Sequence, residues 1–388
     1  MKRIAYFLII VAAVYGFLIG GMLEAQTTPP YDFQTFDFPG ATYTAVHGIN
    51  NSNVFVGLYE DATGRHGFVA HPNNLIIIDI PGATATTVLD INDQGHVVGF
   101  YKDGTGNNHG FLYEDAPDYQ TYTCIDVEFL DLPGDVFETL PASINNNNII
   151  VGRCNVVGYG YMGFKYDGDT YSTIVVPNST FTSALGINDA GHIVGQYIDA
   201  TGKHHAYLRY GTDDYDILDY PGTGVSKTHA WGINNFDEIT GVYEDSVGAH
   251  GFLRDGSTAY SSIDYPNSNR TWSRKINDVG TIVGGYEDTD GVHGFIATPN
   301  YPLGMISYWT LDEGSGTSVI DSVGTNNGTL INGPTWTTGI VGGALNYDGI
   351  DDYLSFGDVN EFDFGTKPFS ILAWVNTTVP GRIMVKSY

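Results

Sequence analysis

Aromatic and basic side chains recur at fixed distances before three of six Ile-Asn pairs in this chain. Positions two, four and six residues before each Ile alternate along an expected strand, so they share one face. In three units that face carries Tyr43, His47, Lys227, His229, Trp231, Arg270, Trp272 and Arg274. Aromatic planes and cationic forks suit an anionic sugar or another anionic ligand. The alternative interpretation is ordinary variation at a partly exposed face.

The Ile-Asn pairs belong to a six-fold repeat, spaced 42 to 53 residues apart. They are Ile49-Asn50, Ile91-Asn92, Ile144-Asn145, Ile187-Asn188, Ile233-Asn234 and Ile276-Asn277. A Pro precedes each pair, a Val-Gly-x-Tyr-like segment follows it, and a triplet related to His-Gly-Phe comes next. Because the shared Ile falls on the same parity as the variable positions, each strand must end or bulge near it.

Each repeat contains about four strand-like pieces separated by Gly- and Asp-rich turns. A period near 43 residues with four strands is typical of a β-propeller blade. We therefore expect an all-β chain with a six-bladed β-propeller-like domain over residues 31–302; a β-solenoid is the rival, although its coils are usually shorter. Closure of the ring would make units five, six and one neighbours.

Two residues that recur in the repeats are expected to be structural. The fifth residue before each Ile is always Thr, which suits a packing or hydroxyl-bonding role. The triplet His recurs beside Gly and Phe, which favours a buried, hydrogen-bonded residue over a metal ligand. Function is then expected where the units differ, and unit three differs most.

The Gly-Ile-Asn-Asp, Ile-Val-Gly-x-Tyr and His-(Gly/Ala)-(Phe/Tyr) marks resemble those of the bacterial extracellular repeat family named for its His-Ala-Phe (HAF) triplet. The resemblance covers about 270 residues. It implies an exported repeat protein and brings no established reaction with it.

Different marks begin near residue 303, including Tyr308-Trp309-Thr310-Leu311-Asp312 and Asn346-Tyr347-Asp348-Gly349-Ile350-Asp351-Asp352. Alternating apolar strands between Gly-rich turns indicate a β-sandwich. Residues 303–388 resemble the N-terminal part of a laminin-G-like, concanavalin-A-like jelly-roll domain. The resemblance implies sugar or protein binding, often with calcium. Asp321, Asp348, Asp351 and Asp352 offer oxygen ligands for calcium, or they cap turns.

The N-terminus has a basic start, Lys2-Arg3, then an apolar run and a small residue at Ala25. This pattern predicts a secretory signal peptide over residues 1–25; an uncleaved anchor helix is the alternative. We expect the mature chain to be secreted or held at the cell surface, with no membrane span after cleavage. In that oxidising setting Cys124 and Cys154 could form a disulfide.

The charge composition of the chain and the placement of its carboxylates limit the classes of function that are expected. The 388 residues include 44 acidic and 16 basic side chains, a net charge of −28, which argues against nucleic-acid binding. Glu138 is the only carboxylate on the variable face, whereas glycoside hydrolysis needs two. We expect a monomeric, non-enzymatic binding or adhesion protein for extracellular glycan or another surface polymer, with calcium as the one suggested cofactor. A structural matrix protein and a polysaccharide-acting enzyme are the alternatives.

Overall fold

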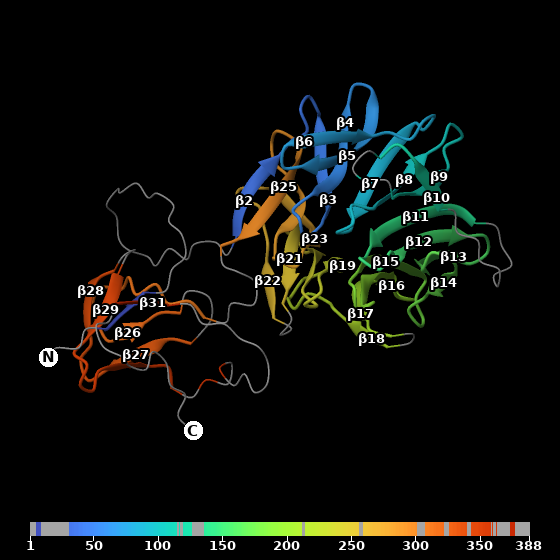
Figure 1. Cartoon of the computed structure of the whole chain (residues 1–388). Helices are drawn as coiled ribbons and strands as arrows, with labels where there is room; N and C mark the ends of the chain where they lie inside the picture. Colours follow the sequence, from blue (N-terminus) through green and yellow to red (C-terminus); the bar gives the residue numbers. More distant parts are fainter. Residues whose placement is uncertain are drawn as a thin grey trace. The chain divides into compact units, whose positions relative to one another are not determined.

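The computed structural model describes residues 5–8, 31–114, 116, 119–125, 136–211, 214–255, 259–300, 307–321, 326–339, 343–357, 359, 362 and 373–376. The chain forms two compact units: residues 29–300, and residues 301–388 together with residues 1–28. No helix among the described residues is long and apolar enough to cross a membrane. The architecture is all-β, as the sequence predicts (Figure 1).

The first unit consists of six blades of four antiparallel strands, one for each repeat. Three blades are separate sheets, and the blades of the last repeat and the first two join into one twelve-stranded sheet through single parallel residue pairs. Blades 1 and 2 contain β3 (Tyr43–Ile49), β4 (Phe55–Asp61), β5 (Gly64–His71) and β6 (Asn74–Ile78), then β7 (Ala85–Ile91), β8 (Val97–Lys102), β9 (Asn108–Tyr113) and β10 (Tyr122–Ile125). Blades 3 and 4 contain β11 (Val136–Ile144), β12 (Ile150–Val156), β13 (Gly160–Tyr166) and β14 (Tyr171–Ile174), then β15 (Phe181–Ile187), β16 (Ile193–Ile198), β17 (His204–Arg209) and β18 (Tyr215–Ile217).

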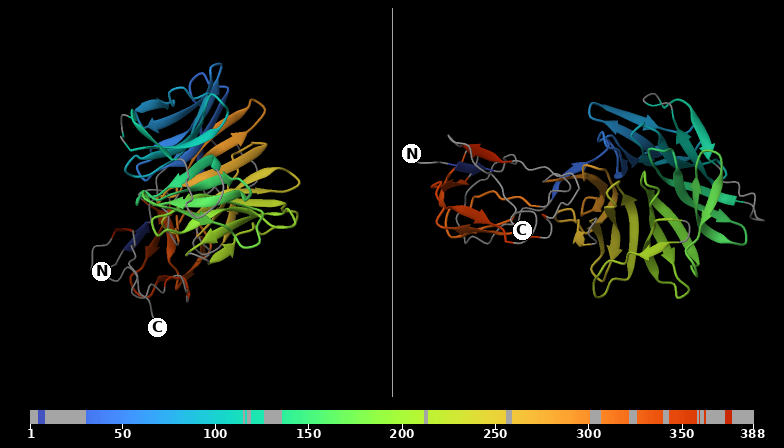
Figure 2. Two further views of the ribbon diagram at one scale, coloured as in Figure 1. Left: turned by 90° about the vertical axis from the view of Figure 1, so that its right-hand side faces the viewer. Right: turned by 60° about the horizontal axis from the view of Figure 1, so that its bottom comes forward.

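Blade 5 contains β19 (Lys227–Ile233), β20 (Ile239–Glu244), β21 (Ala249–Arg254) and β22 (Tyr260–Ser262). Blade 6 contains β23 (Arg270–Ile276), β24 (Ile282–Glu287) and β25 (Val292–Pro299), and its outer strand comes from the other end of the repeat region. That strand is β2 (Tyr31–Phe36), which pairs antiparallel with β25. The last blade is therefore completed by β2, the first strand of the repeat region. In Figure 2 the orange strands of blade 6 lie beside the blue strands of blade 1.

The repeated sequence marks form the cores of the blades. The third residue of each His-Gly-Phe-like triplet is fully buried: Phe68, Phe111, Phe164, Tyr207, Phe252 and Phe295. The repeated Thr is buried in all six blades, and in five of them its hydroxyl accepts a hydrogen bond from a backbone N–H of the preceding segment, as Thr44 does from Phe38 at 3.0 Å. The expected structural role of this Thr is confirmed.

The triplet His joins neighbouring strands of its own blade. In blade 4, His205 Nδ1 lies 2.7 Å from Asp219 Oδ2, and its ring stacks on Tyr197 with centroids 5.0 Å apart. His66, His250 and His293 have equivalent aspartate and tyrosine partners. These side chains are hydrogen-bonded as expected, although they are half-buried rather than fully buried.

The Asn of each Ile-Asn pair is one link in a closed ring. Its Nδ2 donates to the backbone carbonyl oxygen of the equivalent Asn in the next repeat, at 2.9–3.2 Å. The sixth link runs from Asn277 to Asn50 and joins the last blade to the first. The repeats therefore close as a six-bladed propeller.

The residue after each of these asparagines forms a second ring, in which amides and carboxylates alternate. Its members are Asn51, Asp93, Asn146, Asp189, Asn235 and Asp278. Each amide Nδ2 donates to the Oδ2 of both neighbouring carboxylates at 2.8–3.0 Å. We call the end of the propeller that carries both rings the closed end, and the opposite end, where the innermost strands begin, the open end.

The second unit contains two sheets around one core. One sheet has the order β28 (Thr335–Thr338), β29 (Gly343–Tyr347), β1 (Ala5–Leu8) and β31 (Trp374–Asn376); the other has β26 (Ser318–Val319), β27 (Gly328–Ile331) and β30 (Tyr353–Ser355). Leu345 from the first sheet and Val319 and Leu330 from the second share one hydrophobic cluster. This is the predicted partial β-sandwich. Apart from β1, the predicted signal peptide lies outside the described residues and stays a prediction.

Candidate ligand-binding cavity

A β-bulge interrupts the innermost strand of every blade at one position. The register between the first and second strands skips a residue there in all six blades. The skipped residues are His47, Leu89, Ala142, Leu185, Trp231 and Arg274. They stand two positions before the Ile, so of the two expected possibilities, a strand end or a bulge, the structure shows the bulge. Bulges re-aim side chains, and these six all line one central cavity.

A close approach of two strands accompanies each bulge and explains the invariant Gly of the Val-Gly-x-Tyr segment. A Cβ added at Gly57 would lie 2.0 Å from the carbonyl oxygen of Ala45, two residues before the bulge. The equivalent distances in the other five blades are 2.0 to 2.2 Å. No side chain fits at such distances, so glycine lets the second strand pack beside the bulged strand.

The cavity has a volume of about 190 Å³ and lies on the axis of the ring, because all six innermost strands contribute to its wall. Besides the bulge residues, its lining includes Phe100, Leu140, Arg153, Ser183 and Lys275. Three of the 16 basic residues in this acidic chain therefore line one small cavity: Arg153, Arg274 and Lys275.

Lys275 crosses the channel and is fully engaged by other blades. Its Nζ lies 3.0 Å from Asp90 Oδ2, 2.7 Å from Ser143 Oγ and 3.0 Å from the carbonyl oxygen of Leu185. These contacts use all three ammonium donors. Burial lowers the Lys275 pKa, and Asp90 opposes that shift. Lys275, Asp90 and Ser143 each stand one residue after a bulge, so we place them at the floor of the cavity, toward the closed end.

The neighbouring Arg274 is placed differently. Its Cζ lies 4.1 Å from the centre of the Trp231 ring, a close cation–π contact. Burial lowers the pKa of the guanidinium, yet an arginine side chain stays charged. Within the described part of the chain, no hydrogen bond or ion pair reaches this guanidinium. A second guanidinium, that of Arg153, lies 5.8 Å from the Tyr161 ring and has a buried Nε without a hydrogen-bond partner.

His47 contributes a hydrogen-bond acceptor. Its Nδ1 lies 3.1 Å from the carbonyl oxygen of Val88, so Nδ1 carries the proton and Nε2 has a free lone pair. Burial, followed by the charge of Arg274, lowers the His47 pKa to about 3. The ring is therefore neutral at physiological pH. Ser183 adds a fully buried hydroxyl that has no hydrogen-bond partner in the structure.

The other predicted ligand-binding residues lie toward the open end. Lys227, Arg270 and Trp272 line a polar groove of about 490 Å³ between blades 5 and 6. The two cations are paired there: Lys227 with Glu244 at 2.7 Å, and Arg270 with Glu287 at 3.6 Å.

Two predicted residues line neither hollow. His229 Nε2 lies 3.2 Å from His204 Nδ1, and burial lowers the His229 pKa to about 4. Tyr43 begins β3 and lies close enough to Arg274 to influence the guanidinium electrostatically.

Two cavity cations, Lys275 and Arg153, lie outside the eight predicted ligand-binding residues. Arg153 is the more informative of the two. It occupies the variable position of the Val-Gly-x-Tyr segment, where the other units have Leu58, Phe100, Gln196, Val242 and Gly285. That substitution was a usable signal, because only unit three carries a charge there. Glu138, the one carboxylate on the variable face, accepts hydrogen bonds from Tyr161 and Asn108.

The structure divides the predicted calcium ligands. Carboxylate oxygens of Asp348, Asp351 and Asp352 lie within 4.8 Å of one another in a single turn. Asp321 is not part of this group; it is buried and accepts hydrogen bonds from the backbone N–H groups of Tyr308 and Asn326. Calcium at the three-carboxylate turn stays a prediction.

The predicted disulfide is not formed. Cys124 is an exposed thiol on β10, and Cys154 is a buried thiol on β12. The Cys154 Sγ instead contacts the carbonyl oxygen of Met162 at 3.8 Å, and burial raises its pKa to about 12. The two cysteines belong to outer and inner strands of different blades, which the sequence spacing did not reveal.

No family model and no curated protein matches this chain. Among solved structures, it is similar to Trypanosoma rangeli sialidase (TM-score 0.41, 10% identity, covering 78% of this chain and 68% of that one). It is also similar to the six-bladed β-propeller lectin of Aleuria aurantia (0.39, 10%, 70% and 100%) and to SapL1 lectin in complex with alpha methyl fucoside (0.40, 10%, 64% and 89%). Likenesses at these scores carry no argument about ligand or activity.

Proposed function

We propose that this protein binds an acidic extracellular glycan without transforming it, through the open end of the propeller. The observation that carries the proposal is the central cavity. In a chain of net charge −28, it gathers three cations and an aromatic ring, and two of the three guanidinium or ammonium groups lack an anionic partner among the described residues. Aromatic and cationic groups of this kind suit sugars that carry negative charge.

The proposal includes export by the predicted signal peptide and membership of residues 31–302 in the HAF repeat family. The family marks coincide with structural roles in the blades: the triplet aromatic in the core, the Gly beside the bulge and the Asn in the closing ring. We also propose that residues 303–388 are related to laminin-G-like domains.

A glycan array tests this function. The mature full chain is screened on acidic and neutral polysaccharides, and the Trp231→Ala variant is screened alongside it. We expect saturable binding to acidic glycans that Trp231→Ala abolishes. Trp336→Ala is the matched control, because Trp336 lies in the other unit and should leave binding unchanged.

Three outcomes would contradict the proposal. Equal binding of neutral and acidic glycans would remove the role of charge. Binding that needs calcium and disappears in Asp351→Asn would move the site to the second unit. Release of new reducing ends from a bound glycan would show an enzyme.

A further inference from the structure

We infer that the central cavity recognises the carboxylate-bearing terminal residue of that glycan and takes it chain-end first. The inference rests on the proposed glycan binding and adds which part of the glycan is recognised. It follows from the route into the cavity, its size and the hydrogen-bonding groups on its wall.

The cavity can be entered from one end. At the closed end, the alternating ring consists of six side-chain atoms joined by contacts of 2.8–3.0 Å. Opposite atoms of such a hexagon lie about 6 Å apart, twice an edge, which leaves room for no more than about one water molecule. The floor formed by Lys275, Asp90 and Ser143 crosses the channel as well. A polymer therefore cannot thread through, and it reaches the cavity from the open end.

The size of the cavity limits what enters. Its volume of about 190 Å³ is slightly larger than the ~150 Å³ of an apolar cavity that binds benzene, and it lies below the ~300–1,000 Å³ of pockets for drug-sized ligands. One six-membered ring fits, and a second sugar residue does not. An internal residue of a chain would need neighbours on both sides, so a terminal residue is the ligand that fits.

The charged groups of the cavity favour an anion with paired oxygen atoms, such as a carboxylate. Arg274 and Arg153 present guanidinium groups that no described carboxylate neutralises. Lys275 is instead paired with Asp90 at the floor, and the open-end cations Lys227 and Arg270 are paired with glutamates. A guanidinium fork binds a carboxylate through two parallel hydrogen bonds. Attraction for an anion is therefore concentrated inside the cavity.

The uncharged polar groups select a sugar. Ser183 has a fully buried Oγ without a partner, and the orientation of His47 leaves Nε2 as an acceptor on the cavity wall. A ligand that satisfies His47 Nε2 must bring a hydrogen-bond donor, which a sugar hydroxyl supplies, and the Ser183 hydroxyl can pair with a second hydroxyl or with the carboxylate. A uronic-acid residue at the chain end has both.

The test uses methyl β-D-glucuronoside as the probe and methyl β-D-glucoside as its uncharged counterpart, each titrated into the full chain by calorimetry. We expect the glucuronoside to bind at least ten-fold more tightly than the glucoside and than acetate. Arg274→Ala should weaken it at least ten-fold, and Arg274→Lys should recover only part of the affinity, because lysine lacks the fork.

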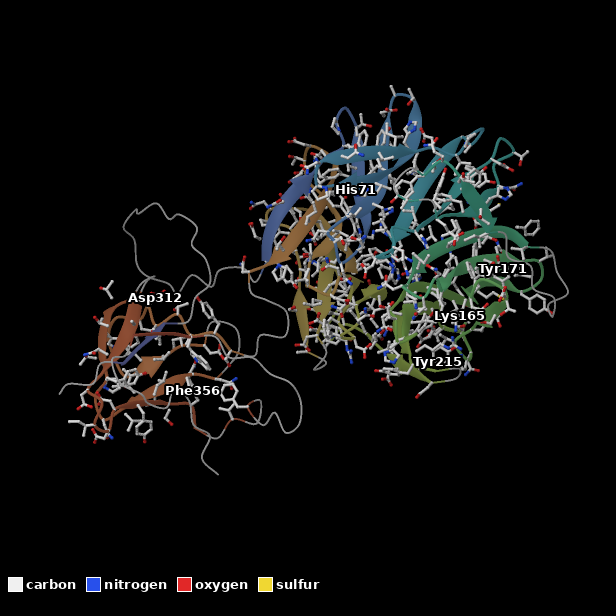
Figure 3. The ribbon with its side chains drawn as sticks, in the orientation of Figure 1. His71, Lys165, Tyr171, Tyr215, Asp312 and Phe356 are labelled. Carbon is white, nitrogen blue, oxygen red and sulfur yellow. The ribbon has the colours of Figure 1, made fainter. Side chains whose placement is uncertain are left out.

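Arg209→Ala is the matched control, since Arg209 also lies over an aromatic ring, with its Cζ 5.9 Å from the centre of the Tyr215 ring. Tyr215, labelled in Figure 3, is on the outer strand of blade 4. The Arg209→Ala variant should bind the glucuronoside with the same affinity as the unmodified chain. Thermal melting of each variant shows whether it is folded.

A second comparison tests chain-end entry. An oligosaccharide with glucuronate at its non-reducing end should bind, and the same glucuronate capped by one glucose should bind at least ten-fold more weakly. Equal binding of capped and uncapped forms would overturn the inference while the proposed function stands on the array result. Equal affinity for acetate and glucuronoside would overturn the sugar part. Silence of the array toward every acidic glycan would overturn the proposed function itself.

Discussion

The two ends of the propeller are built from the same six strands and differ in how strictly the repeats agree. At the closed end every blade contributes an Asn whose amide reaches the next blade. Toward the open end, the residues two, four and six positions before the Ile differ from blade to blade, from Ala142 to Trp231 and Arg274. Each strand therefore combines a shared half that closes the ring with a variable half that shapes the cavity.

This difference indicates that closed-end residues determine the stability of the fold and that, under the proposed function, open-end residues determine ligand recognition. Closed-end side chains are buried or linked from blade to blade, so changing one disturbs two blades. Exposed open-end side chains such as Arg270 contact solvent or a partner in their own blade, so changing one should have little effect on folding.

The largest effect is expected at the closed end. Asn145 donates to the carbonyl oxygen of Asn188 and accepts from the backbone N–H groups of Asn147 and Ile149, and it is 4% exposed. Asn145→Ala leaves these buried groups unpaired and should reduce the free energy of unfolding by about 3 kcal/mol. Urea denaturation measures it.

Asn147→Ala is the control for that variant. Asn147 lies in the same turn, is exposed and makes one side-chain hydrogen bond, to the carbonyl oxygen of Asp189. Its cost should stay below about 1 kcal/mol. Equal losses in the two variants would contradict the closing role of Asn145.

An intermediate effect is expected from acid at the cavity wall. The His47 pKa is about 3 in the folded chain and about 6.5 when unfolded. Below pH 6.5 the unfolded chain binds a proton that the folded chain rejects, so stability is full above pH 6.5 and falls by about 1.4 kcal/mol per pH unit beneath it. Between pH 6.5 and 5.0 the protein should lose about 2 kcal/mol more than His47→Gln, which keeps a donor for Val88. The free energy of unfolding is measured by urea denaturation at both pH values. An equal loss in the unmodified chain and in His47→Gln would refute this assignment.

The smallest effect is expected at the open end. Arg270 has a side chain that is 57% exposed and lies 3.6 Å from Glu287. Arg270→Ala should change the free energy of unfolding by less than about 0.5 kcal/mol, because exposed ion pairs contribute little. A loss comparable to that of Asn145→Ala would erase the proposed difference between the two ends.

Much of the fold follows from the sequence because the repeat states each structural requirement six times. The period gives the blades, the parity of the Ile requires either a strand end or a bulge, and the recurring Thr and Gly mark the contacts that hold the bulged strand. Three residues of the predicted ligand-binding face, His47, Trp231 and Arg274, share one cavity; that they bind a ligand stays a prediction.

Other features depend on positions in space that one sequence does not specify. Lys227, Arg270 and Trp272 fall in a separate groove because they lie farther along the strand from the bulge. The side chains of Asp93, Asp189 and Asp278 look like ordinary turn residues in sequence. Their role in the alternating ring depends on partners 42 to 53 residues away in most cases and on the closure of the propeller.

The alternation of amide and carboxylate around the closed end restricts how this protein can change in size. A ring that alternates two residue types closes without a mismatch only if it has an even number of members. Adding or deleting one blade would bring two amides or two carboxylates face to face, and carboxylates at hydrogen-bond distance repel each other. Blades can therefore be gained or lost only in pairs if the ring is to be kept. Related propellers that keep the ring should contain four, six or eight repeats.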